Sequence, residues 1–287
     1  MNVVSCGRMV ASGKKAQHCA TFPLPFPYKP QATNPIPMPI VTKEEKRETH
    51  PYLKLGNVPG AKRMVLGSFP VYACTDPDTA DKQKMRIENT KKKPIRFFYG
   101  SAYSSFWTLY QQYVDPSLTP PFNEHILRES ITHKKIAFSD TIQSCTRKGE
   151  SALDSSLSEK EWNIEGVQSL LQSGISKVLC TSKGVLRDLE HRIINHNPTH
   201  PFGQVDAEHP TQFQATFLKK LGVANPVLTS PIARVFLVDG RLIEALAIPS
   251  PGSPHRQLRH FGYMAGDRKV FSDGYFAAAF GWLMGNE

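Results

Sequence analysis

Short apolar runs alternate with amphipathic stretches along most of the chain. The runs at 63–67, 134–140 and 177–181 predict strands, because each is apolar and gives way to polar residues at its end. Capped or amphipathic stretches predict helices over 104–114, 158–172, 182–195 and 211–221, and from about Asp273 onward. Strands and helices that alternate in this way are typical of a parallel sheet covered on both faces, so the predicted fold class is α/β.

Residues that often begin and end helices set the expected boundaries. Ser104 or Ser105 can cap the first predicted helix, and the helix predicted from Ser182 begins in the same way. Ser158-Glu-Lys-Glu161 has the pattern of a capping box, and Gly174 supplies a glycine stop for that helix.

A hairpin is predicted near the C-terminus. Arg234–Val238 and Arg241–Ile248 flank an Asp239-Gly240 turn, a pair of residues that favours tight hairpin turns. The second strand runs into a turn rich in proline and serine, Ile248 to Pro254.

The N-terminal part of the chain has a different composition. Residues 21–39 are so rich in proline that neither a helix nor a strand can persist, and residues 1–43 contain no acid. The charged segment Lys43–Glu48 predicts a solvated connector or a short helix. We therefore expect a Pro-rich extension over 1–49, partly disordered or draped on the domain, and a single domain over 50–287. The alternative for the extension is an organelle-targeting segment.

Charge and cysteine content narrow the classes of partner and compartment. The chain has 35 Lys and Arg against 25 Asp and Glu, a formal charge of +10, which favours polyanionic partners such as DNA, although solubility alone can explain it. The five cysteines show no C-x-x-C spacing, which predicts reduced thiols. No apolar run is long enough for a membrane span. These features favour the cytoplasm or a nucleoid or nuclear location.

Two clusters of polar residues are candidate binding sites. Lys91, Lys92 and Lys93 end a charged stretch, which fits either a solvated surface or contact with phosphate. Four histidines fall between His191 and His209, but their spacing lacks the i, i+4 pair and carboxylate of a metal site, so no metal is predicted.

Polar residues at strand ends predict a ligand site. Gly67-Ser68-Phe69, Ser139-Asp140 and Ile248-Pro249-Ser250 each follow an apolar strand, and Phe98-Tyr99 lies in the turn before a helix. The carboxyl ends of parallel strands share one edge of a sheet, where α/β proteins bind ligands. An acid, hydroxyls, backbone donors and an aromatic ring in one cleft suit a planar heterocycle.

Four segments carry a resemblance to a known family. In chain order they read G-S-F-P at 67–70, F-F-Y-G-S-A-Y-S-S-F-W at 97–107, I-A-F-S-D-T-I-Q-S-C-T-R-K-G-E-S-A-L-D-S at 136–155 and I-P-S-P-G-S-P-H-R at 248–256. Together they resemble the motifs of the uracil-DNA glycosylase superfamily, nearest its hypoxanthine-DNA glycosylase and mismatch-specific branch. The resemblance covers residues 60–285.

The resemblance implies a three-layer α/β/α sandwich around a four-stranded parallel sheet, and an enzyme that flips a deaminated base out of DNA and hydrolyses its N-glycosidic bond. It implies the following roles: Gly67 and Ser68 as backbone donors to the leaving base, Phe69, Phe98 or Tyr99 as stacking rings, Ser139 and Asp140 at the base edge, Ser250 and Ser253 at phosphate, and Pro254, His255 and Arg256 as a wedge. Asp140 and Ser68 are the candidate catalytic residues. No cofactor is implied, and a monomer bound to DNA is expected.

Three positions depart from the family pattern. Phe69 stands where efficient relatives place Asp or Asn, Ile248 stands where the last motif often begins with His, and Ser104 replaces an Asn of the hypoxanthine branch. A catalytically weak or inactive nucleic-acid-binding member of the same fold is therefore the alternative. A third hypothesis is a small-molecule or nucleoside hydrolase with a Ser250, His255, Asp140 triad.

Overall fold

The structure is a computed structural model that describes residues 45–75, 95–101, 104–149, 153–206, 209–223, 228 and 230–285. The chain divides into two compact units, Met1–Thr42 and Lys43–Glu287, and every described element belongs to the second. The predicted Pro-rich stretch and the lysines at 91–93 lie outside the described residues.

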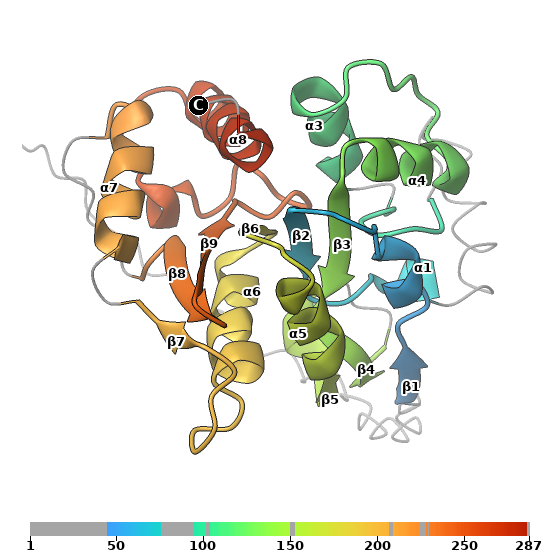
Figure 1. Ribbon diagram of the computed structural model, residues 1–287. Coiled ribbons are helices and arrows are strands. Elements are labelled where there is room, and N and C mark those ends of the chain that lie inside the picture. Colours follow the sequence, from blue (N-terminus) through green and yellow to red (C-terminus); the bar gives the residue numbers. More distant parts are fainter. Residues whose placement is uncertain are drawn as a thin grey trace, which may run out of the picture. The chain divides into compact units, whose positions relative to one another are not determined.

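The larger of two sheets has six strands in the order β3-β2-β6-β9-β8-β7. The first four strands in this order run parallel to one another. They are β3 (Ile136–Asp140), β2 (Arg63–Gly67), β6 (Lys177–Cys180) and β9 (Arg241–Ala247). Strands β8 (Ala233–Val238) and β7 (Gln204–Val205) extend this sheet in antiparallel fashion. Figure 1 shows β2, β3 and β6 side by side, with β7 at the far edge.

The predicted α/β class and the predicted strands of this sheet are confirmed, as is the hairpin of β8 and β9. The sheet is mixed, however, and the three-layer sandwich around four parallel strands stays a prediction. Strand β7 is not among the predicted strands, because two residues are too few to show an alternating pattern.

The predicted helices are present in the predicted order with shifted ends, and α1 (Tyr72–Thr75) and α4 (Glu124–His133) are two further helices that the sequence did not predict. The predicted ones are α3 (Phe106–Tyr113), α5 (Ile164–Gln172), α6 (Lys183–Asp188), which continues as the π-helix η3 (Leu189–Ile194), α7 (His209–Lys220) and α8 (Arg268–Met284). Helix α8 begins earlier than predicted because Asp267 caps it, accepting hydrogen bonds from the backbone N–H groups of Lys269 and Val270. The caps predicted at Ser182 and Ser105 lie where α6 and α3 begin.

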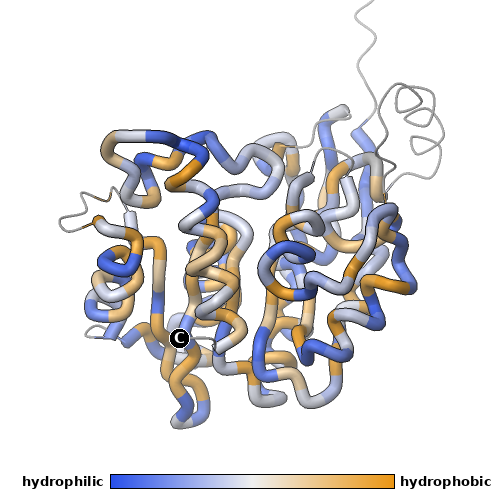
Figure 2. Tube along the Cα trace, turned by 90° about the horizontal axis from the view of Figure 1, so that it is seen from above, coloured by the Kyte–Doolittle hydropathy of each residue, from blue (hydrophilic) through white to orange (hydrophobic). Residues whose placement is uncertain are grey.

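Both faces of the parallel strands are covered. All five residues of β3 are buried, as are four of the five in β2, and successive residues of a strand point to opposite faces. An aromatic cluster fills the space between the sheet and α3, where the Trp107 ring stacks on Phe138 with centroids 5.5 Å apart. Along the helices, hydrophobic and hydrophilic residues alternate, as expected when one side of each helix is buried (Figure 2).

A second sheet of three antiparallel strands adjoins the end of β3. It contains β1 (Lys46–Thr49), β4 (Ile142–Arg147) and β5 (Leu157–Trp162), with β4 in the middle. Only Thr141 separates β3 from β4, and the backbone N–H groups of Thr141 and Ile142 donate to the carbonyl oxygens of Gly67 and Ser68. The chain thus passes from one sheet to the other immediately after Asp140.

This sheet overturns two sequence predictions. The segment predicted as a connector or helix, Lys43–Glu48, contains most of β1, and the folded unit starts before residue 50. The apparent capping box Ser158–Glu161 lies in β5, and helix α5 starts only at Ile164. In both places pairing with β4 prevails over the local signal, since Ser158 donates to the Thr146 carbonyl and Ser144 donates to Glu161.

The described cysteines, Cys74, Cys145 and Cys180, are free thiols. None of the helices in the described ranges combines the length and the apolar character that crossing a bilayer requires.

Candidate active site at the carboxyl edge of the sheet

A cleft of about 1120 Å³ opens at the carboxyl ends of the parallel strands. Residues that follow β2, β3, β6 and β9 line it, together with the turn before α3 and the loop before β5. This is the edge at which polar strand ends were expected to meet. The lining contains hydroxyl groups, two carboxylates, several cationic groups and three aromatic rings.

Most of the predicted site residues lie in this cleft. The predicted residues that line it are Ser68, Phe69, Tyr99, Asp140, Ser250, Ser253, Pro254, His255 and Arg256. Segments almost two hundred residues apart in sequence are thereby brought together. Gly67 lies just behind the lining, and the predicted phosphate contacts at 91–93 fall outside the described residues.

Two predicted base contacts, Phe98 and Ser139, do not line the cleft. Phe98 is 1% exposed and packs against Phe97 and Phe138, so no ring face is available to a base. Ser139 is also buried, and its hydroxyl accepts a hydrogen bond from Asn163 away from the cleft lining. The sequence could not separate Phe98 from its neighbour Tyr99, because adjacent residues in a turn carry no periodic signal.

Asp140 is held by a buried histidine that precedes the first motif. His50 Nε2 lies 2.8 Å from Asp140 Oδ2, and both side chains are at most 3% exposed. The backbone N–H of Tyr52 donates to His50 Nδ1 at 3.0 Å, so Nδ1 is an acceptor and the ring proton lies on Nε2. His50 therefore donates to the carboxylate and fixes its orientation.

Tyr99 contacts the other oxygen of the same carboxylate. Its hydroxyl lies 3.3 Å from Asp140 Oδ1, and its backbone has a left-handed φ of 53°, which is unusual for a bulky residue. Burial, followed by the charge of Asp140, raises the pKa of Tyr99 well above its ordinary value. Tyr99 thus stays a neutral phenol that can donate a hydrogen bond.

Gly67 makes room for this arrangement. A Cβ atom at position 67 would lie 2.3 Å from Asp140 Oδ1 and 2.5 Å from the Tyr99 hydroxyl. Gly67 is also the register partner of Asp140 in the parallel pair β2 and β3. Any side chain at position 67 would displace the carboxylate.

A buried ion pair supports the turn after β2. Arg147 Nε lies 2.9 Å from Glu48 Oε1, and both side chains are at most 4% exposed. The same guanidinium donates to the Pro70 carbonyl at 2.7 Å and lies 5.7 Å from the centroid of the Phe69 ring. Strands β1 and β4 therefore fix the position of Phe69 at the cleft.

Asp154 is a second carboxylate in the cleft, at the end of the loop that leads to β5. The Ser68 hydroxyl donates to its Oδ1 at 2.9 Å. Although Asp154 is exposed as a residue, protein atoms displace solvent from around its carboxyl group, which raises its pKa, and the Ser68 hydrogen bond opposes this shift.

Cationic side chains also line the cleft. Lys183, directly after the cap of α6, donates to the carbonyl oxygens of Ser230 and His260 and lies 5.8 Å from the centroid of the Phe261 ring. Loss of solvent lowers the pKa of Lys183. His255 and Arg256 are exposed at the rim.

Sequence reasoning missed several cleft residues. Thr181 and Lys183 follow a strand, so the rule that identified the other strand ends would have found them. Asp154 stands within one of the four motif segments, but its contact with Ser68 bridges 86 positions. His50 gave no signal, because its role depends on a contact with a residue 90 positions away.

The predicted Ser250, His255, Asp140 triad is not assembled. All three residues line the cleft, but the histidine that contacts Asp140 is His50. Across the described residues, no three His, Cys, Asp or Glu side chains are grouped so that they could hold a metal ion.

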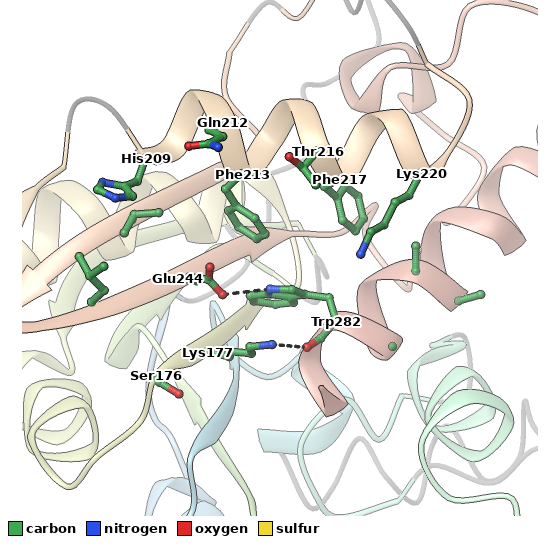
Figure 3. A pocket seen from close by; sticks show the side chains of 15 residues that line it. Ser176, Lys177, His209, Gln212, Phe213, Thr216, Phe217, Lys220, Glu244 and Trp282 are labelled. Carbon is green, nitrogen blue, oxygen red and sulfur yellow. Dashed lines mark hydrogen bonds between the residues drawn. The ribbon is translucent and has the colours of Figure 1, made fainter. Parts of the chain in front are cut away.

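A second cavity, a groove of about 610 Å³, lies between α7 and α8 over the opposite end of β6. Phe213 and Phe217 of α7 face Trp282 of α8 across it, and Lys177 and Glu244 of the sheet both hydrogen-bond Trp282 (Figure 3). These two hydrogen bonds hold α8 to the sheet.

Comparisons of the chain with protein-family models, curated proteins and solved structures return no match.

Proposed function

We propose that the chain is a DNA N-glycosylase that flips a deaminated base, uracil or hypoxanthine, into the cleft and hydrolyses its N-glycosidic bond. One observation carries the proposal: the four segments that resemble uracil-DNA glycosylase motifs contribute Ser68–Phe69, Tyr99, Asp140 and Ser250–Arg256 to a single cleft. A parallel sheet brings strand ends to one edge in any α/β fold, so the support for the proposal lies in the identity and order of the four segments that meet there.

The geometry of the cleft suits a planar base. Phe69 is 7% exposed at its wall, and Asp140 offers a carboxylate whose direction His50 and Tyr99 fix. A carboxylate accepts hydrogen bonds from the N–H groups of a base edge, so a fixed one can discriminate between bases. We therefore assign Asp140 to base recognition, with backbone groups of Gly67 and Ser68 facing the leaving base.

Charge and fold also support the proposal. The chain carries a formal charge of +10, and His255, Arg256 and Lys183 line or border the cleft, where DNA phosphates would approach. Burial of both faces of β2 and β3 supports a three-layer sandwich of the uracil-DNA glycosylase type. Hydrolysis of an N-glycosidic bond requires water and no cofactor. A monomer acting in the cytoplasm, nucleoid or nucleus fits these features.

A non-catalytic DNA-binding protein is the second candidate. It is favoured by Phe69 at the position of an acid and by Asp140, whose two oxygens already have partners. Under this alternative the cleft binds DNA with strong salt dependence but produces no abasic sites.

The decisive experiment incubates the protein with duplexes that contain one uracil, hypoxanthine or xanthine and measures abasic sites by alkaline strand cleavage. The proposal expects cleavage at one of these bases and its loss in Asp140→Ala. Salt-dependent binding to every duplex without abasic sites would establish the non-catalytic alternative. A nucleoside that raises the melting temperature while DNA has no effect would point to a small-molecule hydrolase.

A further inference from the structure

N-glycosidic hydrolysis needs a group that takes a proton from the attacking water. A carboxylate can do so if one of its oxygens is accessible to a water in the cleft. Two carboxylates line the cleft, Asp140 and Asp154. Their hydrogen-bond partners and their exposure differ, so we assign them different roles.

Asp140 is poorly suited to accept a proton. Its side chain is 3% exposed, Oδ2 receives the His50 proton at 2.8 Å, and Oδ1 faces the Tyr99 hydroxyl at 3.3 Å. Both carboxylate oxygens are therefore already in contact with hydrogen-bond donors of the protein, and the side chain offers little surface to a water molecule. Asp140 is a fixed acceptor at the floor of the cleft.

Asp154 has the features that Asp140 lacks. Only its Oδ1 has a hydrogen-bond donor in the described part of the chain, the Ser68 hydroxyl at 2.9 Å, so Oδ2 remains open to the cleft. The contact with Ser68 places this carboxylate over the turn that follows β2. This is the same turn that faces the leaving base in the proposed function.

The backbone around Asp154 is well supported. It begins the 3-10 turn η2 (Asp154–Ser156), in which the backbone N–H and the hydroxyl of Ser156 both donate to the Leu153 carbonyl. The next residue, Leu157, begins β5, which pairs with β4. A carboxylate on such a support keeps its position relative to Ser68, as a catalytic group must.

The charges that face Asp154 agree with a role as a base. Loss of solvent raises its pKa and makes its carboxylate more basic, and the nearby charge of Asp140 acts in the same direction. Ser68, Lys160 and Arg147 act in the opposite direction. Two cleft carboxylates in contrasting surroundings are a common basis for a division of roles.

We infer that Asp154 is the catalytic residue that accepts a proton from the attacking water, and that Ser68 is the positioning residue that orients its carboxylate. This inference rests on the proposed glycosylase function. In the step, the bond between C1′ and the base nitrogen breaks and its electron pair leaves with the base. The water oxygen bonds to C1′, and the water proton passes to Asp154. The products are the free base, once protonated by solvent, and an abasic deoxyribose.

The test is a single-turnover rate measurement against pH, with wild type, Asp154→Asn and Ser68→Ala, on the duplex that the wild type cleaves best. Asp239→Asn is the matched control, because Asp239 is an exposed aspartate in the turn between β8 and β9 and does not line the cleft. Duplex affinity and melting temperature are measured for each variant, so that lost binding or folding is recognised.

Asp154→Asn should lower the rate by about 100-fold or more at unchanged duplex affinity, in line with removal of a general base. The wild-type rate should fall as pH drops through the raised pKa of Asp154, since the protonated acid cannot accept a proton. Ser68→Ala removes a hydrogen bond that lowers this pKa, so the fall should occur at higher pH. Asp154→Asn should show no such fall, and Asp239→Asn should behave as wild type.

An active wild type together with an Asp154→Asn variant of similar rate and similar pH dependence would overturn the assignment of Asp154 and leave the proposed function standing. A wild type that releases no base from any of the duplexes would overturn the proposed function and this assignment with it.

Discussion

The two ends of strand β6 open onto cavities of different character. At its carboxyl end, Thr181 and Ser182 join the cleft, and at its amino end Ser176 and Lys177 join the groove between α7 and α8. The groove is lined mainly by side chains of two helices, whereas the cleft is lined by loops that follow four parallel strands.

The polar groups of the two cavities are used differently. In the groove, Lys177 donates to the Trp282 carbonyl and the indole N–H of Trp282 donates to Glu244, so these groups hold the helix to the sheet (Figure 3). In the cleft, His50 and Tyr99 fix the carboxylate of Asp140 and Ser68 holds one oxygen of Asp154, so these contacts orient side chains that line the cavity. The comparison teaches that a cavity is a candidate site when hydrogen bonds orient polar side chains that line it, as in the cleft. In the groove, the hydrogen bonds of Lys177 and Glu244 instead attach a helix to the sheet.

The largest expected effect comes from the ion pair beneath the cleft. Glu48→Ala leaves the Arg147 guanidinium buried without its carboxylate, which should lower the free energy of unfolding by about 3 to 5 kcal/mol. Urea unfolding measures the change. Glu129→Ala, which removes an exposed pair with His125, is the control and should cost about 0.5 kcal/mol or less. Equal costs for the two variants would show that Arg147 does not depend on Glu48.

Two glycine substitutions compare the cavities directly. Gly67→Ala forces the new methyl group against Asp140 and Tyr99 and should lower the single-turnover rate by about 100-fold, because a displacement of about 1 Å is enough for such a loss. Gly281→Ala lies in the groove with no atom within 4 Å of the new Cβ. It should leave the rate unchanged and stabilise α8 by up to about 1 kcal/mol. A rate that falls equally in both variants would contradict the distinction.

Trp282 of the groove should contribute to stability and not to the rate of base release. Trp282→Phe removes the hydrogen bond to Glu244 and weakens the contact with Lys177, whose Nζ lies 5.4 Å from the Trp282 ring centroid. We expect a loss of about 1 kcal/mol in thermal unfolding and an unchanged rate of base release. A large loss of rate with intact stability would assign function to the groove.

The smallest expected effect concerns DNA phosphates. Arg256→Ala at the cleft rim should weaken duplex binding for every sequence and reduce the slope of log affinity against log salt by about 1. Lys220→Ala, which removes a cation from the groove, should leave the slope unchanged. Fluorescence anisotropy at several salt concentrations measures both, and a reduced slope in Lys220→Ala alone would place DNA at the groove.

The elements that could be predicted from sequence are those whose own residues favour the structure they adopt. The parallel strands are short apolar runs, and the hairpin of β8 and β9 has a turn with strong preferences, so each could be identified from its own residues. Strand β1 and strand β5 could not, because Glu48 and Ser158 are polar and become strand residues only by pairing with β4. Their pairing depends on contacts that no local pattern reports.

The same reason limits prediction of the site. Strand ends directed attention to Ser68, Asp140 and Ser250, because a parallel sheet must bring its carboxyl ends to one edge. The residues that orient or contact them lie far away in sequence: His50 hydrogen-bonds Asp140 across 90 positions, and Asp154 accepts from Ser68 across 86 positions. The two hydrogen bonds of Asp140, which decide how its carboxylate is oriented, are contacts that no local pattern predicts.

The most direct test of the central claim is release of free base from a hypoxanthine or uracil duplex, measured side by side for wild type, Gly67→Ala and Gly281→Ala. If the cleft is the glycosylase site, wild type and Gly281→Ala release the base at equal rates and Gly67→Ala releases it about 100-fold more slowly. Equal release by all three proteins, or none by the wild type, would contradict the account.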